Sequence, residues 1–120
     1  MRLNEVSYED ATPVEGYGPG FFRVGGKVHR GSVLLVPGKV MAWGGFDDTD
    51  AILAAAETTD VLFIGTGVEI AQIPAGLRDT LETAGLGVEL MATPTACRTY
   101  NVLLGEGRRV GAALLPVQAP

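Results

Sequence analysis

The uninterrupted apolar run at residues 61–64, Val-Leu-Phe-Ile, restricts the fold of this chain more than any other stretch. A strand without a polar side is typical of a strand that is buried on both faces, as in parallel sheets. Gly65, Thr66 and Gly67 follow at once and end the strand. Because such a strand needs a covering layer on each side, we expect a sheet with helices packed against it.

Helix and strand signals alternate around this run. Acidic residues precede an Ala-rich segment, and further on Leu77 and Leu81 repeat at helical spacing before a natural C-cap glycine. This alternation favours a mainly parallel sheet. The predicted elements are a strand at 39–43, a helix at 50–57, a strand at 61–64, a helix from Pro74 to Gly85, a strand at 87–91, a helix from Thr93 and a strand at 109–115.

The N-terminal half is rich in strand signals. Residues 21–24 and 27–30 flank Gly25-Gly26, which predicts a β-hairpin, and another strand is expected at 33–36. We expect residues 1–20 to form an ordered but irregular arm, with an edge strand at 3–6. The fold class predicted is α/β in three layers: a central mixed, mostly parallel sheet, helices packed on it, and an N-terminal β-hairpin layer.

Composition narrows the class of protein. A chain of 120 residues forms a single domain, residues 1–120, and its net charge of −5 argues against binding to nucleic acid. No apolar run approaches the roughly 20 residues of a membrane span, and no signal core follows Met1. One Cys and one His form neither an internal disulfide nor a structural zinc site. We therefore expect a cytoplasmic protein without metal or cofactor.

The candidate site lies where three predicted strands end, because ligands of open α/β sheets gather beyond the carboxyl ends of the strands. These ends carry Trp43, the Gly65-Thr66-Gly67 turn and Thr93. Thr93 is a good N-cap and Pro94 suits the first helical position, so a helix of about 11 residues is expected there. Its free amides and the Arg98 guanidinium predict an anion pocket. The pocket candidates are Trp43, Gly65, Thr66, Gly67, Thr93, Thr95, Cys97, Arg98 and Asn101.

Each candidate also has a purely structural interpretation. Cys97 could be a nucleophile activated by the helix start, but a free Cys is more often a core residue, and no base is predicted near it. The positive charge of Arg98 could bind a ligand anion or pair with a carboxylate such as Glu89 or Glu69. Gly65-Thr66-Gly67 lacks the rest of a dinucleotide or P-loop motif.

Trp43 could line the pocket or simply cover the sheet. The acidic group at Asp47, Asp48 and Asp50 could hold a hard cation, but acidic residues at a helix start usually serve as capping groups.

Several of these motifs together resemble a known family. Its features here are Gly65-Thr66-Gly67, Pro74 with Leu77 and Leu81, residues 85–91, Thr93 and residues 96–101. The family is the small domain of unknown function shared by mitochondrial respiratory complex I assembly factor 3 and an adipogenesis-associated human protein, with stand-alone bacterial members. The resemblance implies a three-layer α/β fold and a role in respiratory complex assembly for the mitochondrial member. It implies no catalytic residues.

Two classes of function follow. The first is a binding module for other proteins, respiratory complex subunits among them, which acts as an assembly or accessory factor. The second is a small-molecule enzyme with an anion pocket at the helix start after Thr93. The lack of an acid–base pair near Cys97 favours the first class.

Overall fold

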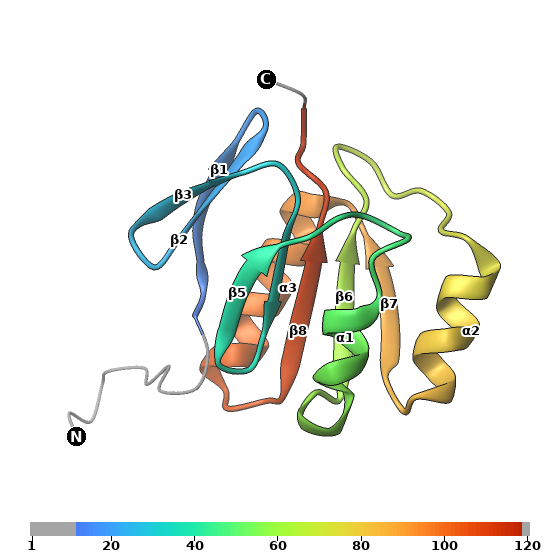
Figure 1. Cartoon of the computed structure of the whole chain (residues 1–120). Helices are drawn as coiled ribbons and strands as arrows, with labels where there is room; N and C mark the ends of the chain where they lie inside the picture. Colours follow the sequence, from blue (N-terminus) through green and yellow to red (C-terminus); the bar gives the residue numbers. More distant parts are fainter. Residues whose placement is uncertain (1–11, 119–120) are drawn as a thin grey trace.

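The fold was obtained as a computed structural model, which describes residues 12–118 (Figure 1). Its centre is a five-stranded sheet with the strand order β5-β4-β8-β6-β7. The strands of this sheet are β4 (Val33–Val36), β5 (Lys39–Ala42), β6 (Val61–Gly65), β7 (Gly87–Met91) and β8 (Val110–Leu114).

Strand directions confirm a mixed, mostly parallel sheet. β6 pairs in parallel with both β7 and β8, whereas β4 is antiparallel to its neighbours β5 and β8. Four of the five strands therefore point the same way, and only β4 is reversed. β6 is an interior strand, although β8 holds the middle position.

Both faces of this sheet are covered. The short helix α1 (Asp50–Ala54) and α2 (Ala75–Thr83) lie on one face, and α3 (Thr93–Gly105) lies on the other (Figure 1). β6 shows this directly, because Leu62 and Ile64 pack with the residues of α1 and α2, whereas Phe63 packs with those of α3. The predicted burial of this strand on both faces is confirmed.

A second, antiparallel sheet of three strands packs on the same side of the central sheet as α3. It consists of β1 (Val14–Gly18), β2 (Phe21–Val24) and β3 (Lys27–Arg30), in that order. The hairpin predicted between β2 and β3 is confirmed, and Gly25 and Gly26 both adopt positive φ angles, of 60° and 77°. Phe22 and Val24 of β2 enter the same core as α3, so this sheet is the added layer.

Three local predictions need correction. Residues 14–18 form β1 and not an irregular arm, because their backbone pairs with β2 despite the glycines. The helix expected at 50–57 ends as an α-helix at Ala54 and continues as a 3₁₀ turn, η1 (Ala56–Thr58). Pro74 precedes α2 as its N-cap. The strand predicted at 3–6 lies outside the described residues.

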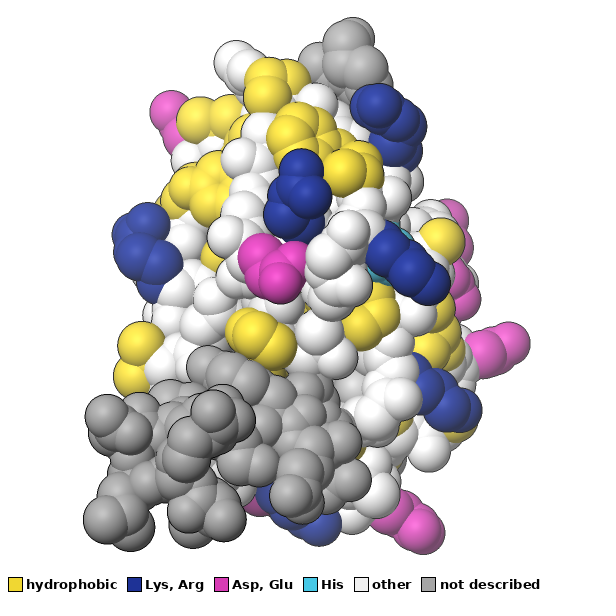
Figure 2. All heavy atoms as spheres, turned by 90° about the vertical axis from the view of Figure 1, so that its left-hand side faces the viewer, with side chains coloured by type: hydrophobic (Ala, Val, Ile, Leu, Met, Phe, Trp, Pro, Cys, Tyr) yellow, Lys and Arg dark blue, Asp and Glu magenta, His cyan; other side chains and the backbone are white. Residues whose placement is uncertain are grey.

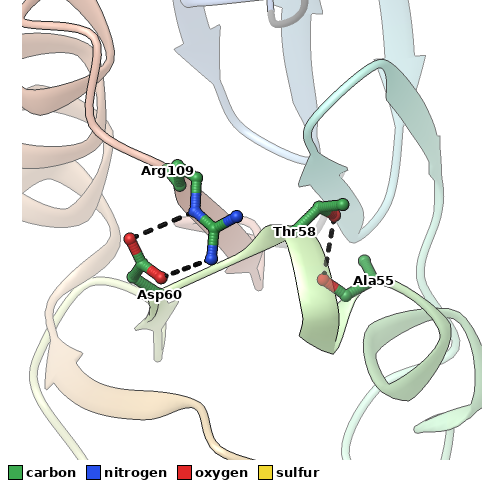
Figure 3. Close-up of polar contacts among 4 residues, drawn as sticks. All are labelled: Ala55, Thr58, Asp60 and Arg109. Carbon is green, nitrogen blue, oxygen red and sulfur yellow. Dashed lines mark hydrogen bonds and ion pairs between the residues drawn. The ribbon is translucent and has the colours of Figure 1, made fainter.

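The amino ends of β6 and β8 are joined by a surface ion pair (Figure 3). Arg109 donates from Nη2 to Asp60 Oδ1 at 2.7 Å and from Nε to Asp60 Oδ2 at 3.3 Å. Hydrogen bonds from Arg109 lower the pKa of the Asp60 carboxyl group. Both side chains are more than half exposed, so the pair aligns the two strands without adding much stability.

Candidate functional site

The carboxyl ends of β6 and β7 meet at one end of the sheet, as predicted, together with that of β8 in place of β5, and they are joined directly to one another. The Thr93 hydroxyl donates to Leu115 O at 2.7 Å and accepts from Gly67 N at 2.9 Å. Thr93 N donates in turn to Gly67 O at 2.8 Å. The Thr93 side chain is fully buried. It therefore occupies, with its hydrogen-bond partners, the position at which an open α/β sheet would bind a ligand.

Gly65 allows the first turn of α3 to approach β6 this closely. A Cβ atom at this position would lie 2.8 Å from Thr93 Oγ1 and 2.9 Å from Leu114 Cδ2. Both distances are shorter than a real side chain tolerates, so any larger residue would push the helix start away from the strand. Gly65 thus serves close packing between strand and helix.

The prediction that Thr93 is the N-cap of α3 is wrong. The cap is Ala92, and it makes no side-chain capping bond, while Pro94 stands in the first turn as expected. The physical reason is that the Thr93 hydroxyl is already engaged with Gly67 and Leu115. Thr93 N is taken by Gly67 O and Ala96 N by Ala92 O, and Pro94 has no N–H, so the helix start presents few amides to an anion.

Thr66 organises the loop that connects β6 to α2. Its hydroxyl donates to Glu69 O at 2.8 Å and accepts from Ala71 N at 2.9 Å. Its own amide donates to Met91 O at 3.0 Å. The loop is therefore held at several points along its length.

Cys97 is buried in the core, as its structural interpretation predicted. It packs in the cluster that includes Phe22 and Tyr100, and only 4% of it is exposed. Burial raises the pKa of the Cys97 thiol to about 11, against a smaller opposing effect of Arg98. A thiol of this kind is almost fully protonated at neutral pH and is shielded from substrates.

Arg98 and Thr95 lie on the exposed side of the first turns of α3. Arg98 Nη2 donates to Thr95 Oγ1 at 3.4 Å. Of the two alternatives for Arg98, the pairing with Glu69 or Glu89 is not found among the ion pairs of the described residues, and the side chain extends into solvent, where water solvates its charge.

Asn101 forms its hydrogen bonds with β1 and not with the strand ends. Its Nδ2 donates to Val14 O at 2.7 Å and its Oδ1 accepts from Val14 N at 2.9 Å, as a neighbouring strand would do. Tyr100 supports this connection by donating to Thr12 O at 2.9 Å. Both residues fix the three-stranded sheet to α3.

Trp43 also lies apart from the other candidates. It follows β5, an edge strand separated from β6 by β4 and β8, and it packs with Ile52 on the face of α1. Its indole donates to Asp48 O at 2.9 Å, and the Asp48 carboxylate accepts from Gly44 N at 2.8 Å. The covering interpretation of Trp43 is the one that this geometry supports.

Metal-binding groups are not assembled in the part of the chain that the structure describes, where no three His, Cys, Asp or Glu side chains lie close enough to hold an ion. A cleft of about 220 Å³ lies between β5 and α1, lined by Val36, Lys39, Met41 and Ala51 among others. It is remote from the strand ends at which a ligand was expected. Within residues 12–118, no helix is long and apolar enough to cross a bilayer.

The residues that sequence reasoning missed at this end of the sheet are Val68 and Ile70. They stand in the β6–α2 loop and are 58% and 64% exposed. Two large apolar side chains next to a Gly-rich turn were the available signal, because such residues in a loop have no strand or helix face to bury them.

Fold and site together define a small three-layer α/β domain whose strand ends are closed by internal hydrogen bonds. The family described as "Protein of unknown function (DUF498/DUF598)" matches residues 14–115. The chain belongs to this family, as its motifs indicated.

Relatives agree with this assignment. An uncharacterised protein of Rhodobacter capsulatus is 51% identical over 117 residues, which cover 98% of this chain and 94% of that protein. The NADH dehydrogenase [ubiquinone] 1 alpha subcomplex assembly factor 3 of Danio rerio is 29% identical over 90% of this chain. The match covers 66% of that factor, so the chain spans about two thirds of its length.

A solved structure confirms the fold. The crystal structure of a Bartonella henselae protein, described there as an outer membrane protein, superposes with a TM-score of 0.82 at 34% identity. The alignment covers 92% of this chain and 98% of that one.

Proposed function

We propose that this chain is a binding module for other proteins, acting in the assembly of a multiprotein complex. The observation that carries the proposal is the pair Val68 and Ile70, large apolar side chains that are 58% and 64% exposed on one loop. Thr66 holds this loop in shape through its bonds to Glu69 and Ala71. A fixed loop that presents apolar side chains loses little conformational entropy on binding, which favours a protein interface.

The relatives suggest which complex. Assembly factor 3 of NADH dehydrogenase shares this domain, so subunits of respiratory complex I are the partners that we propose. The proposal concerns the shared domain, because the match leaves about one third of the factor's length uncovered. On this proposal the chain works in the cytoplasm, the compartment that the sequence predicted.

The second class, a small-molecule enzyme with an anion pocket after Thr93, stays a prediction. It would use Thr93, Cys97 and Arg98, of which Thr93 and Cys97 are buried, whereas Arg98 lies with Thr95 on the exposed side of the first turns of α3. Titration with sulfate or phosphate, read by NMR shifts of the Thr95 and Arg98 amides, tests it. Saturable shifts at millimolar anion would support such a pocket, and shifts no larger than those of remote residues would contradict it.

Affinity capture from the native host tests the first proposal. Tagged wild-type chain is compared with Val68→Asp and Ile70→Asp, each of which places a charge on the loop. Val102→Asp is the matched control, because Val102 is 60% exposed but lies on α3. We expect respiratory subunits with the wild type and the control, and their loss with both loop variants.

Thermal melting establishes that the variants are folded. Capture of the same proteins by all four chains, or of no protein by the wild type, would overturn the proposal.

A further inference from the structure

Charge is distributed unevenly along this acidic chain. Residues 16–46 contain four Lys or Arg and no Asp or Glu, whereas the remaining residues contain five Lys or Arg and fourteen Asp or Glu. The segment therefore carries +4 and the rest of the chain −9. It comprises β2, β3, β4 and β5, and three of its four basic residues, Arg23, Lys27 and Arg30, belong to the small sheet.

The strand register places two of these charges on one face of that sheet. Phe21 is opposite Arg30 and Arg23 is opposite Val28, and opposed residues of antiparallel strands share a face. The intervening Phe22 points the other way into the core. The outward face thus alternates arginine with apolar side chains, and Val28 on it is 46% exposed.

Figure 2 shows the side of the molecule on which this sheet lies, with Lys and Arg side chains spread among exposed hydrophobic ones and with fewer Asp and Glu side chains between them. The ion pairs formed among the described residues, Arg78–Glu82 and Arg109–Asp60, involve neither Arg23 nor Arg30. Along the chain, Glu15 is the acidic residue nearest to Arg23 and Arg30, and its carboxylate accepts a hydrogen bond from Gly26 N at the hairpin turn.

β3 also has one side without a strand neighbour in the described part of the chain. The sheet order is β1-β2-β3, and the opposite edge, β1, is held by Asn101 of α3. In a two-residue hairpin the pairs alternate between bonded and non-bonded, starting with the bonded pair at the turn. The backbone N–H and C=O groups of Val28 and Arg30 therefore point away from β2.

We propose that this edge and face bind an acidic, extended segment of a partner protein, which adds to the sheet as a strand beside β3. Strand addition uses the free backbone groups for affinity and alternate side chains for specificity. Here Arg23 and Arg30 select carboxylates and Val28 selects an apolar side chain. The inference rests on the proposed protein-binding function and assigns a second surface to it.

Charged residues on an edge strand can also serve only to prevent self-association. That role explains Arg30 but not the exposed Val28 between two arginines. An anionic membrane would satisfy the charges, yet it offers no strand to pair with the β3 backbone. An acidic polypeptide satisfies both features.

The test is selection of random ten-residue peptides, displayed on phage, against the immobilised chain. We expect the selected peptides to alternate Asp or Glu with apolar residues. Synthetic copies are then titrated against wild type, Arg23→Glu, Arg30→Glu and the control Arg108→Glu, an exposed arginine outside the sheet. We expect about tenfold weaker binding to the first two variants and a change within about twofold for the control.

Hydrogen exchange locates the bound peptide. The amides of Val28 and Arg30 should become protected, and those of the edge strands β5 and β7 should not. Selected peptides without an excess of Asp and Glu, unchanged affinity of the Arg23 and Arg30 variants, or protection at β5 or β7 would each overturn the inference. If the two arginines matter only for flotation of the chain with phosphatidylglycerol vesicles, the surface binds a membrane and the inference is overturned. If they matter only for dimer formation, measured by sedimentation, the surface binds a second copy of the chain and the inference is likewise overturned.

Val68→Asp separates this inference from the function proposed above. This loop variant should bind the acidic peptides like the wild type while it loses partner capture. If peptide binding fails but capture still depends on Val68 and Ile70, only the second surface is refuted. If capture fails as well, the protein-binding function is refuted with it.

Discussion

Thr93 is the residue whose removal most directly tests the closed strand ends. Thr93→Val keeps the shape of the side chain but deletes the hydroxyl, which leaves Leu115 O and Gly67 N without the partner they have at 2.7 and 2.9 Å. An ordinary hydrogen bond contributes about 1 kcal/mol, and a buried polar group left unpaired costs about 1–3 kcal/mol. We expect Thr93→Val to lower the free energy of unfolding by about 2–4 kcal/mol, because both partners are affected.

Thr93→Ser is the matched control, since it keeps the hydroxyl and loses one methyl group, at a cost of about 1 kcal/mol. Urea denaturation measures the stability of both variants. If the slope of the free energy of unfolding against urea concentration is unchanged, the difference in midpoint reflects a difference in stability. Amide exchange at Gly67 should accelerate in Thr93→Val and not in Thr93→Ser. A Thr93→Val variant no less stable than Thr93→Ser would show that the two hydroxyl bonds do not stabilise the strand ends.

Three further predictions address the core and the small sheet. Leu77→Ala and Leu81→Ala should each cost about 2–5 kcal/mol, because both are buried where α2 meets the sheet, and unchanged urea midpoints would contradict this. Cys97, with its pKa raised to about 11 from 9.0, should react with iodoacetamide at pH 7 at least about 100-fold more slowly than a free thiol. A rate equal to that of a free thiol would show that Cys97 is accessible. Asn101→Leu removes both bonds to Val14 and should speed amide exchange in β1 while β6 stays protected, so equal effects on both strands would argue against a local role.

Features set by neighbouring residues were predictable from the sequence. The β2–β3 hairpin follows from two glycines with positive φ between short strands, and β6 follows from its lack of polar residues. The end of α2 follows in the same way from Gly85, whose φ is 97°. In each case the deciding interaction lies within a few residues along the chain.

The site depended on contacts between distant residues, and there the predictions were less successful. Thr93 has every property of an N-cap, but Gly67 and Leu115, which are 26 and 22 residues away, take its hydroxyl. Asn101 was assigned to a pocket, yet its partner Val14 is 87 residues distant. Trp43 does follow a strand that points the same way as β6, but strand order, which no local pattern reveals, places two strands between them.

The arrangement of α3 explains how one small domain could hold two surfaces in fixed relation. At its start, Thr93 bonds to Gly67, the residue before the exposed Val68 of the loop. Two turns later, Asn101 bonds to β1 and so fixes the three-stranded sheet.

The helix α3 therefore connects the loop that carries Val68 and Ile70 to the three-stranded sheet, and movement of either relative to the other would break part-buried hydrogen bonds. In open α/β sheets, ligands bind beyond the carboxyl ends of the strands. In this chain the same position joins α3 to the sheet, and on the two proposals above this connection would hold the β6–α2 loop and the three-stranded sheet at a set distance from each other.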